Sequence, residues 1–379
     1  MTTVFEHATI YTGTRVIRDG YLRFGEKVEN VGPVADYFPR ANEKVVDMRG
    51  KLLLPGFIDV HTHGGYSFDT MDGDAEELDK MVRTVAHEEG VTTIFPTTMT
   101  QSKEKIDKAM ASINEAAQHN RLIGGTHLEG PFVSPVYKGA QPEQYIIKPD
   151  PDLLDHWDNL SGGRVKMITY APENADAKFE NYCLSHGIVL SAGHSNATRA
   201  EMKASKASHV THLYNAQREF RHREPGVTGH ALLEDNIICE IISDGFHVCP
   251  DMINLAYKLK GPHRIELVTD SLRAKGMPEG ISELGGQKVI VKDKQARLEN
   301  GHLAASIVQY NDAVKNIVKF TGCSINDAVQ MSSVNQAREF HLAGKGSLEE
   351  GADADINVMT PELDLLQTYS YGQLMEAVK

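Results

Sequence analysis

Short apolar runs that end in polar or glycine-rich residues recur eight times along the chain, and stretches that can form helices lie between them. The runs cover residues 51–63, 91–98, 123–130, 165–172, 187–194, 209–215, 237–247 and 265–270. Apolar strands that alternate with helices indicate parallel strands buried on both faces. Eight such units favour a closed (β/α)8 TIM barrel. An open doubly wound sheet is the alternative, but it usually has a glycine fingerprint after its first strand, and HTHGGYS is not one.

The segment from 74 to 90 shows the clearest helical pattern. Leu78, Met81, Val82 and Val85 recur at i, i+3, i+4 and i+7, and Gly90 is placed to end the helix. Similar patterns predict further helices at about residues 103–118, 175–186, 198–206, 251–260 and 307–320.

The two ends of the chain have a different pattern. Residues 1–50 contain short alternating segments with glycine-rich turns, and the tail that includes GSLEEGADADINVM again suggests turns and a strand. We therefore expect a small β-sandwich domain built from residues 1–52 and 345–379, beside a catalytic barrel of residues 53–344. The segment 280–303 is expected to form a hairpin inserted after the eighth strand.

Composition and charge narrow the classes of function. The 379 residues are 41% hydrophobic and 24% charged, as in packed globular proteins, and the formal net charge is −13. This charge argues against nucleic acid or an anionic membrane as a partner, although one pocket can still be locally positive. Four scattered cysteines without a CxxC pair indicate reduced thiols. We find neither a signal peptide nor a bilayer-spanning apolar run, and expect a cytoplasmic protein.

Metal-binding side chains stand at the carboxyl ends of the predicted strands. His61 and His63 close the first run, Glu129 the third, His194 the fifth and His212 the sixth. Residues i and i+2 of a strand point the same way, and a barrel gathers the carboxyl ends of its strands at one mouth. Because neutral imidazole suits Zn or Fe and carboxylate adds charge, this pattern predicts a transition-metal site.

Several motifs resemble known families. PGFIDVHTHG resembles the signature of the amidohydrolase superfamily. HLEGPF, SAGHS, THLYNA, HREPG, DGFHV and LVTDSLRAKGM together resemble the N-acetylglucosamine-6-phosphate deacetylases of that superfamily, and the resemblance covers the whole chain. It implies metal-dependent hydrolysis of the acetamide of N-acetylglucosamine 6-phosphate to glucosamine 6-phosphate and acetate, in amino-sugar catabolism.

The resemblance also implies which residues hold the metal. Glu129, His194 and His212 match the ligands of the principal divalent ion. His61 and His63 match the ligands of a second ion, with Glu129 as the bridge. Some members of the family lack these two histidines and work with one metal, so one or two ions per subunit, Zn or Fe, are expected.

Asp270, which closes the eighth run, matches the general base and acid of the family, and His247 matches the hydrogen-bond donor to the acetyl carbonyl. These roles agree with elementary chemistry. A divalent metal brings the pKa of water near neutrality, so a nearby carboxylate can take the water's proton and return it to the leaving amine. A metal and an imidazole can then stabilise the oxyanion.

The sugar and phosphate contacts are carried over in the same way. The matching residues are Ala140, Gln141, Asn215, Ala216, Arg223, His247, Leu303, Ala304 and Ala305. The family is usually a homodimer in which the matching arginine, here Arg223, reaches the phosphate in the neighbouring site. Gln141 stands where many relatives have histidine, Ala305 where glycine is commoner, and Ser271 where alanine is frequent.

Two other classes of function are compatible with these motifs. One is a different amidohydrolase activity, such as an N-acyl amino acid deacylase or a cyclic amide hydrolase. The other is an inactive barrel that serves as a binding or scaffold protein. The basic segment 218–223, which includes HREPG's arginine, favours a phosphorylated substrate. An inactive barrel typically loses its metal ligands, and here every expected ligand is present.

Overall fold

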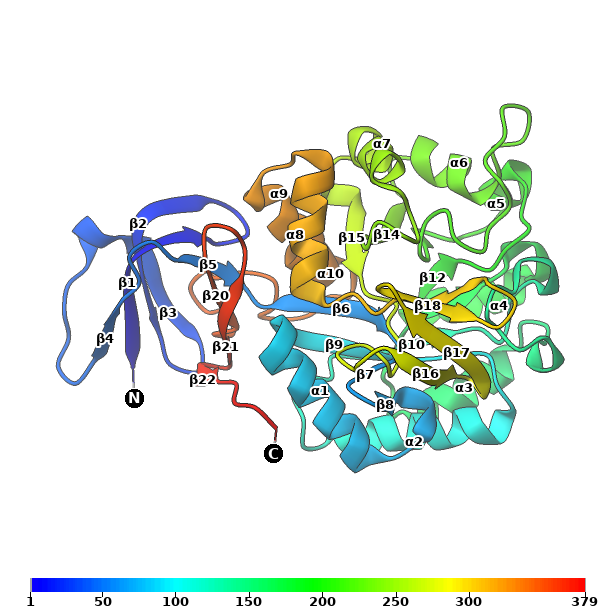
Figure 1. Cartoon of the computed structure of the whole chain (residues 1–379), viewed down its shortest axis with the longest axis horizontal. Helices are drawn as coiled ribbons and strands as arrows, with labels where there is room; N and C mark the ends of the chain where they lie inside the picture. Colours follow the sequence, from blue (N-terminus) through cyan, green and yellow to red (C-terminus); the bar gives the residue numbers. More distant parts are fainter. Residues whose placement is uncertain (1, 379) are drawn as a thin grey trace.

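A computed structural model describes residues 2–378 of the chain. The middle of the chain forms a barrel with surrounding helices, on the right of Figure 1. The two ends of the chain meet in a smaller β domain on the left. No helix within residues 2–378 is both long enough and apolar enough to cross a membrane. The four cysteines form no disulfide.

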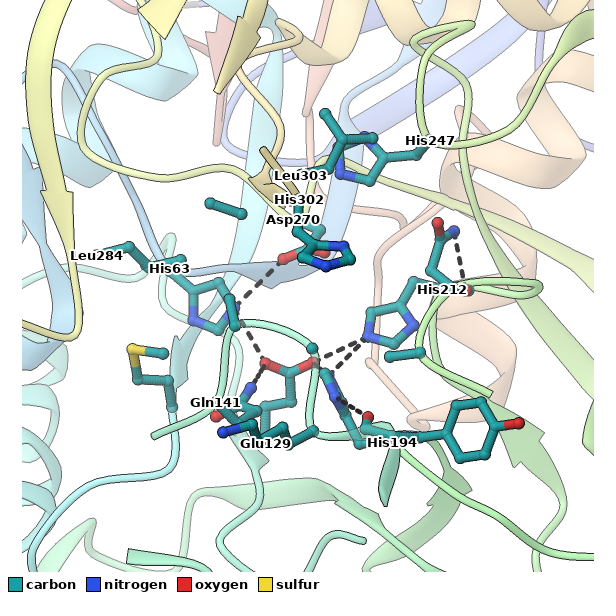
Figure 2. A pocket seen from close by; sticks show the side chains of 18 of the residues that line it. His63, Glu129, Gln141, His194, His212, His247, Asp270, Leu284, His302 and Leu303 are labelled. Atoms are coloured by element: carbon teal, nitrogen blue, oxygen red, sulfur yellow. Dashed lines mark hydrogen bonds and ion pairs between the residues drawn. The ribbon is translucent and has the colours of Figure 1, made fainter. Parts of the chain in front are cut away.

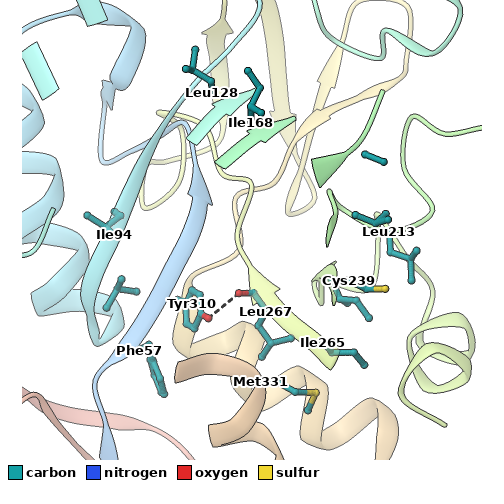
Figure 3. Close-up of a cluster of buried hydrophobic side chains, with 14 of the residues drawn as sticks. Phe57, Ile94, Leu128, Ile168, Leu213, Cys239, Ile265, Leu267, Tyr310 and Met331 are labelled. Carbon is teal, nitrogen blue, oxygen red and sulfur yellow. Dashed lines mark hydrogen bonds between the residues drawn. The ribbon is translucent and has the colours of Figure 1, made fainter. Parts of the chain in front are cut away.

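Eight parallel strands, in the spatial order β15-β14-β13-β12-β11-β10-β9-β6, form the wall of the barrel. Each strand lies within one of the eight predicted runs, so the predicted parallel barrel is confirmed. Outward-facing side chains of these strands pack against the helices in one large apolar core (Figure 3). The strands are β6 Phe57–Thr62, β9 Val91–Thr98, β10 Thr126–Glu129, β11 Val165–Tyr170, β12 Val189–Ala192, β13 His209–Val210, β14 Ile238–Ile242 and β15 Ile265–Val268.

The seam between the first strand, β6, and the last, β15, is closed at the mouth of the barrel by main-chain hydrogen bonds beyond the regular ladder. The N–H of Asp270 donates to the carbonyl of His61 at 2.8 Å, and the N–H of His63 donates to the carbonyl of Ser271 at 2.9 Å. The seam thus holds side by side three of the residues that the sequence assigned to the active site.

Deeper in the barrel, a side chain occupies the same seam. The hydroxyl of Tyr310, at the start of α8, lies 2.9 Å from the carbonyl oxygens of both Ile58 on β6 and Leu267 on β15 (Figure 3). Tyr310 is fully buried. Its single O–H is therefore shared between the carbonyls of the two strands, and the carbonyl of Leu267 also accepts from the side-chain amide of Gln336 at 3.4 Å.

The helices around the barrel include all those that the sequence predicted. They are α1 Ala75–Glu89, α2 Lys103–Ala117, α3 Pro151–Leu160, α4 Ala177–Ser185, α5 Arg199–Ala204, α6 Gly226–Leu233, α7 Pro250–Lys260, α8 Tyr310–Thr321, α9 Ile325–Val329 and α10 Asn335–Glu339. Short 3-10 turns occur at Val34–Asp36, Thr70–Asp72, Pro135–Tyr137, Glu143–Tyr145, Pro172–Asn174 and Pro262–Arg264.

Helix α1 begins and ends as its sequence requires. The carboxylate of Asp74 accepts hydrogen bonds from the N–H groups of Glu76 and Glu77, which caps the first turn. Gly90 ends the helix in the left-handed conformation, with φ 79°. The predicted apolar face, which includes Leu78 and Met81, is buried.

Four of these helices, α3, α6, α9 and α10, were not predicted. α6 is buried along almost its whole length, so its sequence GVTGHALL has no polar face to reveal the helical period. α9 and α10 are joined by a π-helical turn at Gln330–Val334, which shifts the period of 3.6 residues. α3 does have a start signal, since Asp150 caps it and Pro151 occupies its first turn.

The small β domain is one eight-stranded sheet that curls around its own core. Its strands are β1 Thr3–Tyr11, β2 Val16–Phe24, β3 Val28–Pro33, β4 Lys44–Asp47, β5 Leu52–Pro55, β20 Ile356–Met359, β21 Leu365–Ser370 and β22 Gln373–Leu374. The ring of Tyr369 on β21 lies 5.4 Å from Phe5 on β1 and 5.9 Å from Phe24 on β2, although β21 and β2 lie far apart in the sheet order. The curled sheet agrees with the expected sandwich. The boundaries 1–52, 53–344 and 345–379 stay a prediction.

The expected hairpin after the eighth barrel strand is a four-stranded antiparallel sheet. Its strands are β16 Gly280–Leu284, β17 Gln287–Lys292, β18 Gln295–Leu298 and β19 Leu303–Ala305. A second small hairpin pairs β7 Gly64–Gly65 with β8 Phe68–Asp69. The inserted sheet is tied to the barrel loops, because the side-chain amide of Gln287 donates to the carbonyl of Ala140 at 2.6 Å.

We predict that Tyr310→Phe lowers the free energy of unfolding by about 1–3 kcal/mol, because the buried carbonyls of Ile58 and Leu267 lose the hydroxyl that they share while the packing of the ring is kept. Urea denaturation measures this change. Tyr145→Phe is the control, since Tyr145 is only half-buried in the loop after β10. Equal stability of the two variants would contradict a bridging role for the hydroxyl.

Candidate active site

A pocket of about 480 Å³ lies at the mouth of the barrel, bordered by the inserted sheet. Its volume lies in the range of small-molecule sites. Figure 2 shows polar side chains from several strand ends that converge in it. The lining residues are His63, Met99, Glu129, Pro135, Val136, Tyr137, Lys138, Gly139, Ala140, Gln141, His194, His212, Asn215, Ala216, His247, Asp270, Leu284, Asn300, His302, Leu303 and Ala304.

Glu129, at the end of β10, is the centre of the site. Its Oε1 lies 3.0 Å from Nε2 of His194 and 3.1 Å from Nε2 of His212, and the two Nε2 atoms are 3.1 Å apart (Figure 2). These three ligand atoms lie together closely enough to bind one ion. The structure thus brings together the residues that the sequence assigned to the principal metal.

His63 approaches the second oxygen of Glu129, whereas Nε2 of His61 lies 3.6 Å from Oε1. Nε2 of His63 lies 3.2 Å from Oε2 of Glu129 and 3.3 Å from Oδ1 of Asp270. Nε2 of His61 lies 3.4 Å from the same Asp270 oxygen and has no hydrogen-bond partner within the described residues, although it is fully buried. An unpartnered buried nitrogen beside two carboxylates fits a cation.

The orientation of the imidazoles also fits a metal. The Nδ1–H of His63 donates to the carbonyl of Thr97 at 3.2 Å, and that of His194 donates to the carbonyl of Tyr137 at 3.1 Å. In both rings Nε2 is then left with its lone pair towards Glu129. Bonding of the outer nitrogen in this way is typical of histidines that bind metals.

The electrostatics of the site favour a bound cation. Burial alone would lower the pKa of His61, but the carboxylates of Glu240, Asp270 and Glu129 raise it to about 9. Burial alone would raise the pKa of Asp270, but His61 and His63 hold it below its usual value. These buried carboxylates are therefore ionised and attract positive charge.

Three strand-end residues of the site adopt the left-handed backbone conformation. The φ angles are 48° at His194, 31° at His212 and 47° at Asp270. Such angles are unfavourable for residues with a side chain and are typical of functional positions, where the surrounding structure holds them. Here the conformation occurs where each chain segment turns away from its strand and its side chain reaches the pocket (Figure 2).

His247 lines the pocket near Leu303 (Figure 2). Its Nδ1 lies 2.6 Å from Oδ2 of Asp244, and its main-chain N–H donates to Oδ1 of the same carboxylate at 2.8 Å. Asp244 therefore fixes the ring and leaves Nε2 for the pocket. Asp244 was not among the residues assigned from the sequence, although it stands three residues before His247 in the motif DGFHV.

Most of the residues expected to contact substrate line the pocket, and two do not. Ala140, Gln141, Asn215, Ala216, Leu303 and Ala304 line it. Ala305 is buried in the apolar cluster beneath the inserted sheet. Arg223 is exposed in the turn of segment 221–224, outside the pocket of its own chain.

Gln141 makes a contact that the sequence did not predict. Its side-chain amide donates to Oε2 of Glu129 at 2.6 Å, and its side-chain oxygen accepts from the N–H of Thr100 at 2.7 Å. The sequence also missed His302, which belongs to the inserted sheet's last connection and lines the pocket. No motif marks either contact, because each depends on how separate loops pack.

Comparison with known proteins agrees with this geometry. The profile of the amidohydrolase family matches residues 52–375, and the chain belongs to that family. It is 40% identical to the N-acetylglucosamine-6-phosphate deacetylase of Lysinibacillus sphaericus, over 94% of each chain. It is 39% identical to the enzyme of the same name from Bacillus subtilis (strain 168), over 96% of this chain and 95% of that one. The resemblance read from the motifs is confirmed.

A solved structure supports the same assignment. It is a mutant N-acetyl-D-glucosamine-6-phosphate deacetylase from Mycobacterium smegmatis in complex with N-acetyl-D-glucosamine-6-phosphate. It is 28% identical to this chain, with a TM-score of 0.91 over 99% of both chains. Amidohydrolases are metal-dependent, and the histidine and carboxylate groups around Glu129 are positioned for a metal.

We predict that His212→Ala lowers the affinity for the metal by at least roughly 10- to 100-fold. Loss of a residue that only hydrogen-bonds a ligand costs this much, and His212→Ala removes a ligand atom itself. The metal content after dialysis, measured by mass spectrometry, tests this. His230→Ala is the control, since His230 is a buried histidine outside every candidate donor group. Full metal retention in His212→Ala would exclude this ligand set.

Proposed function

We propose that the protein hydrolyses the acetamide of N-acetylglucosamine 6-phosphate to glucosamine 6-phosphate and acetate, in amino-sugar catabolism. The observation that carries the proposal is the meeting of Asp270, His247 and the Glu129 donor group in one pocket. Relatives that carry this activity in their names match the chain over nearly its whole length.

Glu129, His194 and His212 would hold one divalent ion, and His61 and His63 would hold a second with Glu129 between them. Such an ion, Zn or Fe in this proposal, activates water for attack and polarises the acetyl carbonyl. The amide of Gln141 already occupies Oε2 of Glu129, the oxygen that faces His63. This contact favours the first position as the one filled more tightly.

Asp270 is placed to move the proton. Its carboxylate is ionised near neutral pH, as its lowered pKa indicates, and it is one of the residues that line the pocket. In the proposed reaction it takes the proton of the attacking water and delivers it to the nitrogen as the C–N bond breaks. His247, held by Asp244 through Nδ1, would hydrogen-bond the acetyl oxygen through Nε2 and stabilise the negative charge that develops there.

The phosphate group of the substrate requires a cationic side chain, and among residues 2–378 of one chain the only lysine or arginine that lines the pocket is Lys138. Lys138 lines the pocket but already pairs with Glu143 at 2.7 Å. Arg223 is exposed and lies outside its own pocket. We therefore propose a homodimer in which Arg223 of one subunit binds the phosphate in the neighbouring site through its forked guanidinium. A phosphorylated metabolite as substrate also supports a cytoplasmic location.

Acetate release tests the choice of substrate. We predict that the phosphorylated sugar is hydrolysed with a kcat/KM roughly 10- to 100-fold above that of the unphosphorylated sugar, since charged hydrogen bonds to the phosphate contribute about 1.5–3 kcal/mol. Arg223→Ala removes this preference, whereas Arg221→Ala, at an exposed arginine paired with Glu219, keeps it. Equal rates on both sugars in the unaltered protein would favour another amidohydrolase activity.

Mixing two impaired variants tests whether Arg223 of one subunit serves the active site of the other. In a heterodimer of Arg223→Ala and Asp270→Asn subunits, one of the two sites has both Asp270 and a partner arginine. Mixing and refolding these variants is therefore expected to restore part of the activity. No gain on mixing would exclude a phosphate contact from the neighbouring subunit.

We predict that Asp270→Asn lowers kcat by roughly 100- to 10,000-fold, because the amide cannot accept and return the proton. Metal content is expected to stay unchanged, since the candidate donor groups consist of other residues. Circular dichroism and metal analysis provide the controls. Substantial turnover by this variant would mean that another group moves the proton, and no activity in the unaltered protein with any metal would favour a binding protein.

A further inference from the structure

A buried carboxylate that no motif marked lies directly behind the candidate metal ligands. Glu240 stands in the middle of β14, in the apolar run ICEII, and is fully buried. Its Oε2 accepts a hydrogen bond from Nδ1–H of His61 at 2.8 Å and another from the main-chain N–H of His212 at 2.9 Å. One oxygen atom therefore contacts two candidate ligands that come from different parts of the barrel wall.

The contact with His61 sets the orientation of that ring. With Nδ1 bonded to Glu240, Nε2 is the ring nitrogen that faces Glu129 and Asp270, at 3.6 Å and 3.4 Å. His63 and His194 are oriented by main-chain carbonyls, whereas the partner of His61 is a carboxylate. A carboxylate acceptor forms the stronger, charge-assisted bond and makes the ring a better donor to a metal.

The contact with His212 holds its backbone. His212 has a φ of 31°, which is unfavourable for a residue with a side chain. The hydrogen bond from its N–H to Glu240 anchors this residue at the point from which Nε2 reaches Glu129. Loss of the acceptor would leave a buried N–H unpaired and release the turn.

Further groups hold Glu240 itself in place. Nε2 of His209 lies 3.4 Å from the other oxygen of Glu240, and Nδ1 of His209 lies 3.0 Å from Glu339 on α10. All three side chains are almost completely inaccessible to solvent. The connected series Glu339, His209, Glu240 and His61 thus links α10 to the candidate metal centre.

We propose that Glu240 is a positioning residue that sets the affinity of the centre for its divalent ion by orienting His61 and His212, without touching substrate. The proposal rests on the proposed function only in assuming that the centre binds a metal. Glu240 is thus not a ligand itself, and it affects the substrate only by its effect on metal binding.

Glu266 offers a matched control. It is paired with Glu240 in the register of β14 and β15, and it is equally buried. Its carboxylate oxygens lie beside His209 and Glu339, at the far end of the series from His61. They have no hydrogen-bond partner within residues 2–378, so they bond to none of the candidate ligands. Glu266→Gln therefore makes the same chemical change one strand away, without a contact to His61 or His212.

The test measures metal affinity directly. Protein stripped with a chelator is titrated with Zn²⁺ against a chromophoric chelator of known affinity. We expect Glu240→Gln to bind Zn²⁺ roughly 10- to 100-fold more weakly than the unaltered protein. Glu266→Gln is expected to bind it with unchanged affinity. Equal affinities in the two variants, or equal losses, would overturn the proposal.

Two further measurements separate positioning from general damage. In a His61→Ala background, the additional loss caused by Glu240→Gln is expected to shrink, because one of the two contacts is already absent. An undiminished loss would contradict action through His61. If Glu240→Gln fails to fold, Glu240→Asp keeps the charge at a shorter reach, and the same Zn²⁺ titration decides: unchanged affinity would overturn the proposal.

The activity of Glu240→Gln gives an independent check. At saturating Zn²⁺ its KM for the phosphorylated sugar is expected to match that of the unaltered protein, while activity at limiting Zn²⁺ falls. A raised KM at saturating Zn²⁺ would place Glu240 in substrate binding instead. Because the titration needs no substrate, weak Zn²⁺ binding by this variant would stand even if the proposed deacetylation were disproved.

Discussion

The carboxylate of Glu129 is almost completely buried, and its oxygens lie within 3.2 Å of three imidazoles and one side-chain amide. A buried carboxylate is costly unless its charge is balanced. Here the balance comes from histidines at three strand ends and from an amide in a loop, so the geometry of the site depends on this one side chain. Because the carboxylate of Glu129 needs positive charge beside it, the site also suits a divalent ion. The rest of the barrel mouth holds the imidazoles and the amide at hydrogen-bond distance from Glu129.

The seam of the barrel and the inserted sheet make this arrangement rigid. Main-chain hydrogen bonds join the ends of β6 and β15, which brings Asp270 beside His61 and His63. Tyr310 closes the same seam below. The inserted sheet β16–β19 then borders the pocket on the open side and supplies apolar and histidine side chains to its lining. The candidate metal ligands therefore lie at the strand ends, and much of the remaining lining comes from loops and the inserted sheet.

The chain matches the amidohydrolase family over residues 52–375. Gln141 and Glu240 are not among the candidate metal ligands carried over from that family, yet they contact them. Gln141 bonds Oε2 of Glu129, and Glu240 bonds His61 and His212. Two chains with the same ligands can thus differ in metal affinity, because the groups behind the ligands differ.

Local sequence determined the elements of the fold. The eight strands lie within the predicted apolar runs, and α1 has the predicted cap, apolar face and terminal glycine. Such features depend on neighbouring residues, whose periodicity is visible along the chain. The same holds for the candidate ligands, because a polar residue at the end of an apolar strand is itself a local signal. Helix α6 was not predicted, because a helix that is buried on every side has no alternation of apolar and polar residues.

Contacts between distant segments were decided by the tertiary structure. No sequence motif assigned a role to Glu240, and only the closed barrel places it against His61, 179 residues away. Gln141 was expected to touch substrate, yet it also bonds the carboxylate of Glu129. Arg223 lies outside its own pocket, and Ala305 lies beneath the lining. Each of these placements depends on how loops and strands pack in three dimensions, which the order of residues along one segment does not encode.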